Sequence, residues 1–254
     1  MRHVLALTRR ELATYFLGPM AFLVLLAFQV IAWLNFWDLV DALARNQRTV
    51  SGLRDPLNSY ITGSTPFWIG MMVAIPALTM RLLAEERRSG TLESLLTAPV
   101  TEAEVVVAKW LAGVVMYLVL LIPFALYLPF LYYQANYRFD LGPVLALGLG
   151  LTTLGMMFVA IGLFFSALTR NQVVAAVGTF AALFVLVLVN TVMANYASLR
   201  RASWGDAASF VSVINQLTTL GTGRLDLRFP AIHLSACALM LYLTTKIVQY
   251  RREG

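Results

Sequence analysis

Residues 141–169 read LGPVLALGLGLTTLGMMFVAIGLFFSALT and contain no aspartate, glutamate, lysine or arginine. An α-helix rises about 1.5 Å per residue, so about 20 apolar residues cross the ~30 Å hydrocarbon layer of a bilayer. This stretch of 29 residues is therefore long enough and apolar enough to span a membrane as one helix.

Five further stretches share this property. The other charge-free windows are Leu12–Trp37, Pro56–Met80, Trp110–Tyr137, Asn171–Leu199 and Phe229–Thr245. An additional window, 207–223, carries seven serine, threonine, asparagine or glutamine side chains, so we expect it to lie at the interface or to re-enter the bilayer. The pattern predicts an all-α polytopic membrane protein with six spanning helices.

The overall composition supports lipid as the solvent of the chain. Of the 254 residues, 59% are hydrophobic and 13% are charged, whereas soluble domains average about 45–50% and about 25%. These values exclude a disordered chain and an ordinary soluble enzyme. The net charge of +6 comes without a long Lys/Arg run interleaved with aromatic residues, so we expect no nucleic-acid partner. The single cysteine, Cys237, allows no internal disulfide.

The distribution of basic residues predicts the orientation. Six spans place both termini on one side, where eleven Lys and Arg residues would lie, against eight on the other side. The residues that count most are those close to span ends in short loops. They favour the terminal side: Arg9, Arg10, Arg81, Arg87, Arg88, Arg170, Lys246, Arg251 and Arg252. We therefore expect both termini in the cytoplasm.

The first 17 residues have the pattern of a helix that lies along the membrane surface. Leu5, Leu12, Tyr15 and Phe16 share one helical face, and the arginines lie off that face. The sequence Gly18-Pro19 then separates this helix from the first span. The alternative is that the segment is only a basic flank that fixes the topology.

The connection between the second and third spans, residues 84–104, contains helix start and stop residues that a simple loop does not need. Thr91 can cap a short helix, Pro99 must end it, and Thr101 with Glu104 forms a capping box that begins the third span. That short helix would present three leucines toward the cytosol, which need a partner to cover them: Leu92, Leu95 and Leu96. Either a soluble motor or the chain's own N-terminal helix could provide the cover.

Two motifs resemble a known family. Residues 86–99, ERRSGTLESLLTAP, resemble the coupling region of ABC-2 type transporter permeases. Residues 9–19, RRELATYFLGP, resemble the opening of the gliding-motility (Gld-type) and nitrous-oxide-reductase-maturation branches, with Thr14 and Gly18 where those often have serine.

The resemblance implies an architecture for residues 1–254. It comprises an elbow helix (1–17), a coupling region (85–104), an outer segment (195–228) and spans at 18–37, 66–83, 105–133, 143–168, 172–194 and 229–248. It also implies a bacterial inner-membrane location, two ABC ATPase subunits and a second permease copy, identical or related. Members of the gliding-type branch add an auxiliary subunit with a periplasmic domain.

The resemblance further implies which residues couple the chain to its ATPase. They are Glu86, Gly90, Thr91, Leu92, Glu93, Leu95, Leu96 and Pro99. Arg9, Arg10 and Glu11 of the elbow helix are expected to seat this coupling region.

The chain itself lacks the chemistry of a motor. Its two lysines, Lys109 and Lys246, do not belong to a phosphate-binding G-x4-G-K-[ST] loop. We therefore expect no cofactor on this chain, with ATP and Mg²⁺ bound by the partner ATPase. His3 and His233 have no metal-ligand spacing, so we expect no metal site. We expect His233 to be an interfacial histidine or one with satisfied hydrogen bonds, and not a ligand.

Two other function classes are consistent with parts of the pattern. An ATP-driven scaffold could transmit force to a periplasmic partner without passing a substrate. An intramembrane enzyme would need a catalytic constellation, and the sequence gives no G-x-S-x-G motif. A proton- or sodium-coupled carrier is disfavoured because the spanning windows hold no ionisable Asp, Glu, Lys or Arg.

Overall fold

The computed structural model describes residues 2–45, 58–90, 101–134, 141–195 and 210–253, and within these ranges the chain forms helices joined by turns. The helices are α1 (Arg2–Leu17), α2 (Pro19–Arg45), the π-helical turn η1 (Asn58–Thr62), α3 (Thr65–Thr79), α4 (Ala84–Ser89), α6 (Glu102–Gln134), α7 (Leu141–Leu168), α8 (Gln172–Asn195), α11 (Val213–Gly221) and α12 (Arg228–Glu253).

Six segments of the described chain are long and apolar enough to cross a membrane. They are Pro19–Asp41, Thr65–Ser89, Glu102–Tyr127, Gly142–Leu168, Gln172–Val189 and Arg228–Tyr250. This confirms the predicted all-α polytopic membrane fold. The polar window at 207–223 is not among these segments, and its described part contains the short helix α11, which packs against α7.

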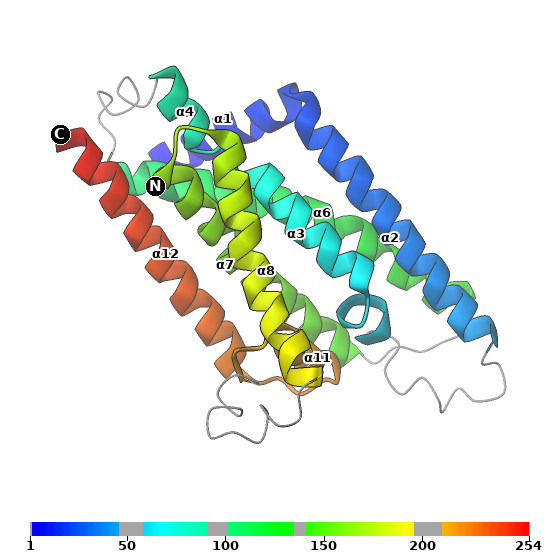
Figure 1. Cartoon of the computed structure of the whole chain (residues 1–254). Helices are drawn as coiled ribbons and strands as arrows, with labels where there is room; N and C mark the ends of the chain where they lie inside the picture. The colour runs from blue at the N-terminus through cyan, green and yellow to red at the C-terminus, as the bar shows by residue number, and fades with distance from the viewer. Residues whose placement is uncertain (1, 46–57, 91–100, 135–140, 196–209, 254) are drawn as a thin grey trace.

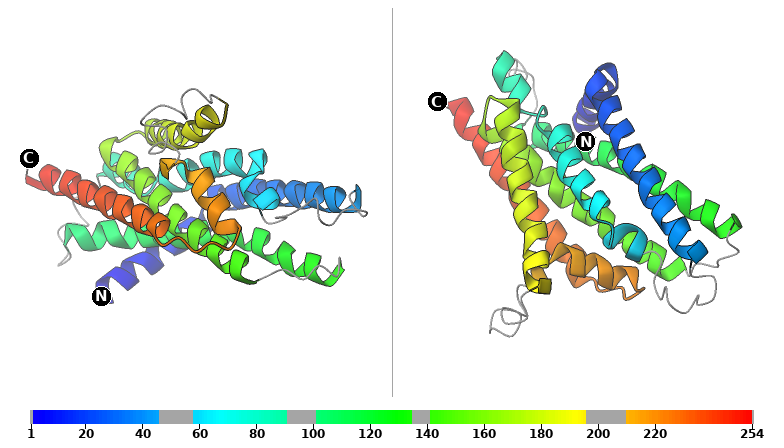
Figure 2. Two further views of the ribbon diagram at one scale, coloured as in Figure 1. Left: turned by 90° about the horizontal axis from the view of Figure 1, so that it is seen from below. Right: turned by 45° about the vertical axis from the view of Figure 1, so that its right-hand side comes forward.

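The spanning helices alternate in direction, and both chain termini lie at the same end of the bundle (Figure 1). We call this end the terminal end and the opposite one the far end. Helix α1 crosses the terminal end, next to α4, and α11 lies at the far end (Figures 1 and 2). At the terminal end, α1 and α4 therefore lie close to the start of α6 and the end of α7.

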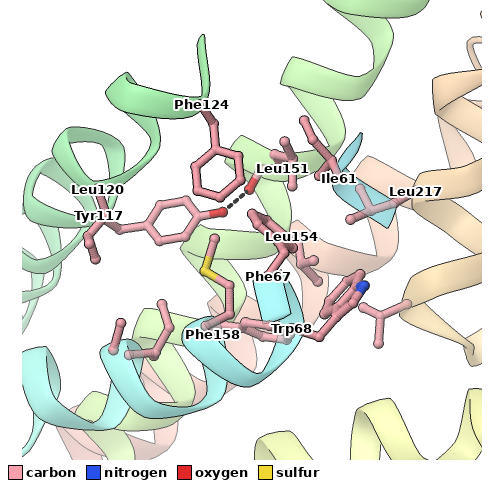
Figure 3. Packing of buried hydrophobic residues seen from close by; sticks show 14 of the residues in the cluster. Ile61, Phe67, Trp68, Tyr117, Leu120, Phe124, Leu151, Leu154, Phe158 and Leu217 are labelled. Atoms are coloured by element: carbon pink, nitrogen blue, oxygen red, sulfur yellow. Dashed lines mark hydrogen bonds between the residues drawn. The ribbon is translucent and has the colours of Figure 1, made fainter. Parts of the chain in front are cut away.

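Helix α7 is the centre of the packing and contacts α3, α6, α8, α11 and α12. Its glycines permit close approach, because a Cβ atom at Gly155 would overlap the ring of Tyr117 and one at Gly162 would overlap Thr79. The Tyr117 hydroxyl donates a hydrogen bond of 2.8 Å to the Leu151 carbonyl, which fixes the ring in the core (Figure 3).

We expect Gly155→Ala to destabilise the bundle, since the added methyl group must displace the buried Tyr117 ring. Overpacking of this kind costs about 1–3 kcal/mol. The melting temperature of the purified protein in detergent measures the loss. Gly148→Ala is the matched control, because a Cβ atom there meets nothing within 4 Å. Equal melting temperatures for the two variants would contradict the packing described for α6 and α7.

Polar side chains in the spans bond to one another between helices. His233 of α12 is fully buried, with one ring nitrogen 2.8 Å from Gln216 Oε1 and the other 3.1 Å from Thr153 Oγ1. The expectation of a satisfied structural histidine is therefore confirmed. Gln29 donates to the Tyr127 hydroxyl at 2.8 Å, and Asn35 accepts from Ser64. These bonds stabilise the helix packing at the far end.

Candidate functional site at the terminal end

A turn at residues 80–83 interrupts the helix between α3 and α4. We call this turn the bend, and one serine from α7 satisfies its backbone groups. Ser166 Oγ accepts hydrogen bonds from the backbone N–H groups of Leu83 and Ala84, both at 3.0 Å, and donates one of 3.0 Å to the Met80 carbonyl. The Ser166 side chain and the two donors are buried, where unpaired backbone groups are costly. The bend is therefore held in a defined geometry by the end of α7.

Helix α4 continues from the bend and is also anchored to α7. The Arg87 guanidinium donates to the Ala167 carbonyl. Glu85 and Glu86 in the first turn and Arg87 and Arg88 in the last turn complement the helix dipole. Gly90 ends the helix in the left-handed conformation with φ of 72°, which favours glycine. The sequence thus stops α4 directly before residue 91.

The other border of the connection is the predicted capping box. The Thr101 N–H donates to Glu104 Oε2 at 3.0 Å, and the Glu104 N–H donates to Thr101 Oγ1 at 3.3 Å. Helix α6 begins at Glu102, as this reciprocal pair requires. The two helix ends that border residues 91–100 are therefore fixed, one by Gly90 and the other by the capping box.

Three segments that are distant in sequence meet in one ion cluster. Lys109 Nζ of α6 lies 2.9 Å from Glu11 Oε1 of α1 and 2.8 Å from Glu86 Oε1 of α4. The Lys109 side chain is only 3% exposed, and each glutamate side chain is 19% exposed. The cluster therefore joins the elbow helix, the bend and the start of the third span in a largely water-free position.

The charges of the cluster do not balance. When both glutamates are ionised, two carboxylates share one ammonium group, which leaves one negative charge without a counterion. The second oxygen of Glu86, Oε2, is buried and has no hydrogen-bond donor among the described residues. Because each desolvated ion costs several kcal/mol unless it is paired, the two carboxylates depend on Lys109. The position of α1 is consequently tied to that of α4.

Two further bonds hold α1 against the bundle. The Thr8 hydroxyl is shared between the Val4 carbonyl of its own helix at 2.8 Å and the Ala108 carbonyl of α6 at 3.2 Å. The Tyr15 hydroxyl donates to the Leu78 carbonyl of α3 at 2.6 Å. Burial raises the pKa of the Tyr15 phenol, so it stays protonated and remains a donor. Helix α1 is thus bonded directly to α3 and α6, and it is linked to α4 through Lys109.

The inward face of α1 differs from the predicted apolar stripe. Leu12 and Tyr15 pack against the core, but Leu5 is 67% exposed and Phe16 is 45% exposed. The side chains turned inward instead include Thr8 and Glu11, which find hydrogen-bonding and ionic partners on α6. A search for an apolar stripe misses this face, because its polar residues are satisfied by a helix about 100 residues away.

The predicted site residues fall into three groups. Glu11 and Glu86 meet through Lys109, and Gly90 ends α4. Arg9 and Arg10 lie on the same helix with exposed side chains. The remaining residues lie outside the part of the chain that the structure describes: Thr91, Leu92, Glu93, Leu95, Leu96 and Pro99. The short helix expected after Thr91 lies there too.

Sequence reasoning missed Lys109 and Ser166 as members of the site. The charge-free window that begins at Trp110 places Lys109 outside the third span, but in the structure Lys109 is buried within the span Glu102–Tyr127. An ammonium group in the first turns of an apolar span signals a buried partner. Ser166 gave no signal, because a serine near the end of a spanning helix commonly bonds within its own helix.

Residues 20–243 match the ABC-2 family transporter protein family. The chain belongs to this family, whose members are membrane components of ABC transporters and are not themselves the ATPase. The match begins after α1, so the elbow helix lies outside it. No curated protein gives a significant match to the chain.

Proposed function

We propose that the chain is the membrane-spanning permease subunit of an ABC-2 type transporter, driven by ATP hydrolysis on a separate ATPase subunit. Family membership and the six spanning helices support the permease role. The observation that carries the coupling is the Glu11–Lys109–Glu86 cluster, which binds the borders of residues 91–100 to α1.

The route of the force follows from these contacts. The ATPase would press on residues 91–100, and the leucines Leu92, Leu95 and Leu96 would provide the apolar surface for docking. The displacement would pass into α4 through Gly90 and into α6 through the capping box. Because Lys109 joins both helices to Glu11, α1 would move with them, and α2 follows α1 after a single residue, Gly18.

The orientation and location follow the charge distribution. The terminal end would face the cytoplasm, where the ATPase is found, and the protein would reside in a bacterial inner membrane with several spans. ATP and Mg²⁺ would be bound by the ATPase. The opening motif at residues 9–19 favours the gliding-motility or nitrous-oxide-maturation branch, in which an auxiliary periplasmic subunit would join the complex.

A second permease copy and two ATPase copies would complete the transporter. Three spanning windows are less than a third buried within the chain, those of α2, α8 and α12, and we place the second copy on α8. The exposed apolar side chains of α8 recur at intervals of three and four residues: Val173, Val177, Phe180, Phe184 and Leu188.

The proposal is tested by co-expressing the chain with candidate ABC ATPases and measuring co-purification and ATP turnover in proteoliposomes. We expect Leu95→Asp to lower co-purification and stimulated ATP turnover at least tenfold, because a charge enters the docking surface. The control is Leu225→Asp, the same exchange at an exposed far-end position. Undiminished docking and turnover in the Leu95 variant, with normal membrane insertion of both, would contradict the coupling role.

A further inference from the structure

A cavity of about 210 Å³ lies under the elbow helix, between α1, the first turns of α2, the bend after α3, α4 and α6. It is larger than the ~150 Å³ cavity that holds a benzene molecule in an engineered protein. Its rim includes the exposed residues Thr14, Met20 and Ser89, so it is open to the surroundings. The cavity can therefore admit part of a larger molecule.

The lining of the cavity is divided into two halves. Met20, Val24, Ala77 and Leu82 supply an apolar half from the start of α2, the end of α3 and the bend. Arg10, Arg81, Glu85 and Glu86 supply a charged half from α1, the bend and α4. This change from apolar to ionic lining occurs where spanning helices end, which is where a phospholipid changes from acyl chain to headgroup.

The charges in the lining specify the headgroup. The lining holds three basic side chains, Arg10, Arg81 and Lys109, and three acidic ones, Glu11, Glu85 and Glu86. Lys109 is paired with Glu11 and Glu86 in the buried cluster, whereas the Arg81–Glu85 pair, with Nε and Oε2 2.8 Å apart, stays partly exposed at 35% and 46%. An added anion would leave the cavity with a net negative charge, whereas a zwitterion leaves it neutral. Arginine binds phosphate through paired N–H donors, and carboxylates accept from an ammonium group.

We propose that the cavity binds a zwitterionic phospholipid with a primary ammonium group, that is, a phosphatidylethanolamine. Its phosphate would lie at Arg10 and Arg81, its ammonium at Glu85, and the start of an acyl chain along Met20 and Val24. Because the Arg81–Glu85 pair is partly exposed, its guanidinium and carboxylate keep accessible N–H groups and oxygen atoms for the two charges of the headgroup. A trimethylammonium headgroup cannot fill this role because it has no N–H donor.

The inference does not depend on ATP-driven transport, and the experiment uses the purified permease alone. Delipidated protein is given equal amounts of dioleoyl phosphatidylethanolamine, phosphatidylcholine and phosphatidylglycerol, and native mass spectrometry measures which lipid it retains. We expect phosphatidylethanolamine to be retained about tenfold over each competitor, a factor that corresponds to about 1.4 kcal/mol. Equal retention of the three lipids, or a preference for phosphatidylglycerol, would overturn the proposal.

Variants locate the site, and a soluble competitor distinguishes a lipid headgroup from a free zwitterion. Arg10→Gln, at an exposed position that leaves folding intact, and Arg81→Gln should each abolish the preference, while Arg88→Gln on the exposed side of α4 should preserve it. Soluble glycerophosphoethanolamine is added as a competitor. If it displaces the lipid at equal concentration, the ligand is a soluble zwitterion and the lipid assignment is wrong. Persistence of the preference in both arginine variants would also overturn it.

Discussion

Replacing Lys109 with methionine is expected to be among the most damaging single substitutions in the protein. Methionine fills a similar volume but leaves Glu11 and Glu86 close together without the ammonium group that pairs them. Removing one partner of a buried ion pair costs about 3–5 kcal/mol. The melting temperature in detergent and the yield of membrane-inserted protein measure the effect. Lys246→Met, at an exposed lysine of α12, is the matched control.

The combined variant Glu11→Gln, Lys109→Met, Glu86→Gln separates stability from coupling. With no buried charge left, we expect its melting temperature to recover most of the loss. Stimulated ATP turnover with the ATPase should stay low, because α1 is no longer bonded through the cluster to α4. If the Lys109→Met variant has the melting temperature of the wild type, the cluster does not stabilise the protein. If the combined variant keeps full stimulated ATP turnover, the cluster does not couple α1 to α4.

Ser166→Ala is expected to give the second large effect. The exchange removes one hydroxyl but leaves three backbone groups without their partner, the N–H groups of Leu83 and Ala84 and the carbonyl of Met80. Each buried polar group left unsatisfied costs about 1–3 kcal/mol. We expect a lower melting temperature and faster hydrogen exchange at Leu83 and Ala84.

The control for this substitution is Ser235→Ala on α12, where the hydroxyl is exposed and bonds to the Ala231 carbonyl of its own helix. That variant should melt close to the wild type. A Ser166 variant that retains both the melting temperature and the exchange protection would show that the bend is held by other contacts.

The spans and the start of α6 could be predicted because their causes are local. A charge-free window needs only its own length to qualify as a membrane helix. The Thr101–Glu104 capping box likewise forms between residues three positions apart, and α6 begins where the box requires. In both cases the physical cause lies within one segment of sequence.

The ion cluster and the bend could not be predicted because their partners are distant. Glu11 and Lys109 are separated by 98 positions, and Ser166 lies 83 positions from Leu83. Composition and helical periodicity carry no information about which helices pack side by side. The inward face of α1 shows the consequence, since the polar residues Thr8 and Glu11 are buried by a neighbour that only the fold supplies.

The central claim is that residues 91–100 at the terminal end receive force from a cytoplasmic ATPase. The most direct measurement is cysteine crosslinking in membrane vesicles, with Leu95→Cys introduced into a Cys237→Ala background so that one thiol remains. We expect this thiol to be labelled from the cytoplasmic side and to crosslink to the ATPase subunit with a yield that changes when ATP binds. Labelling from the opposite side, or cytoplasmic exposure without any ATPase crosslink, would contradict it.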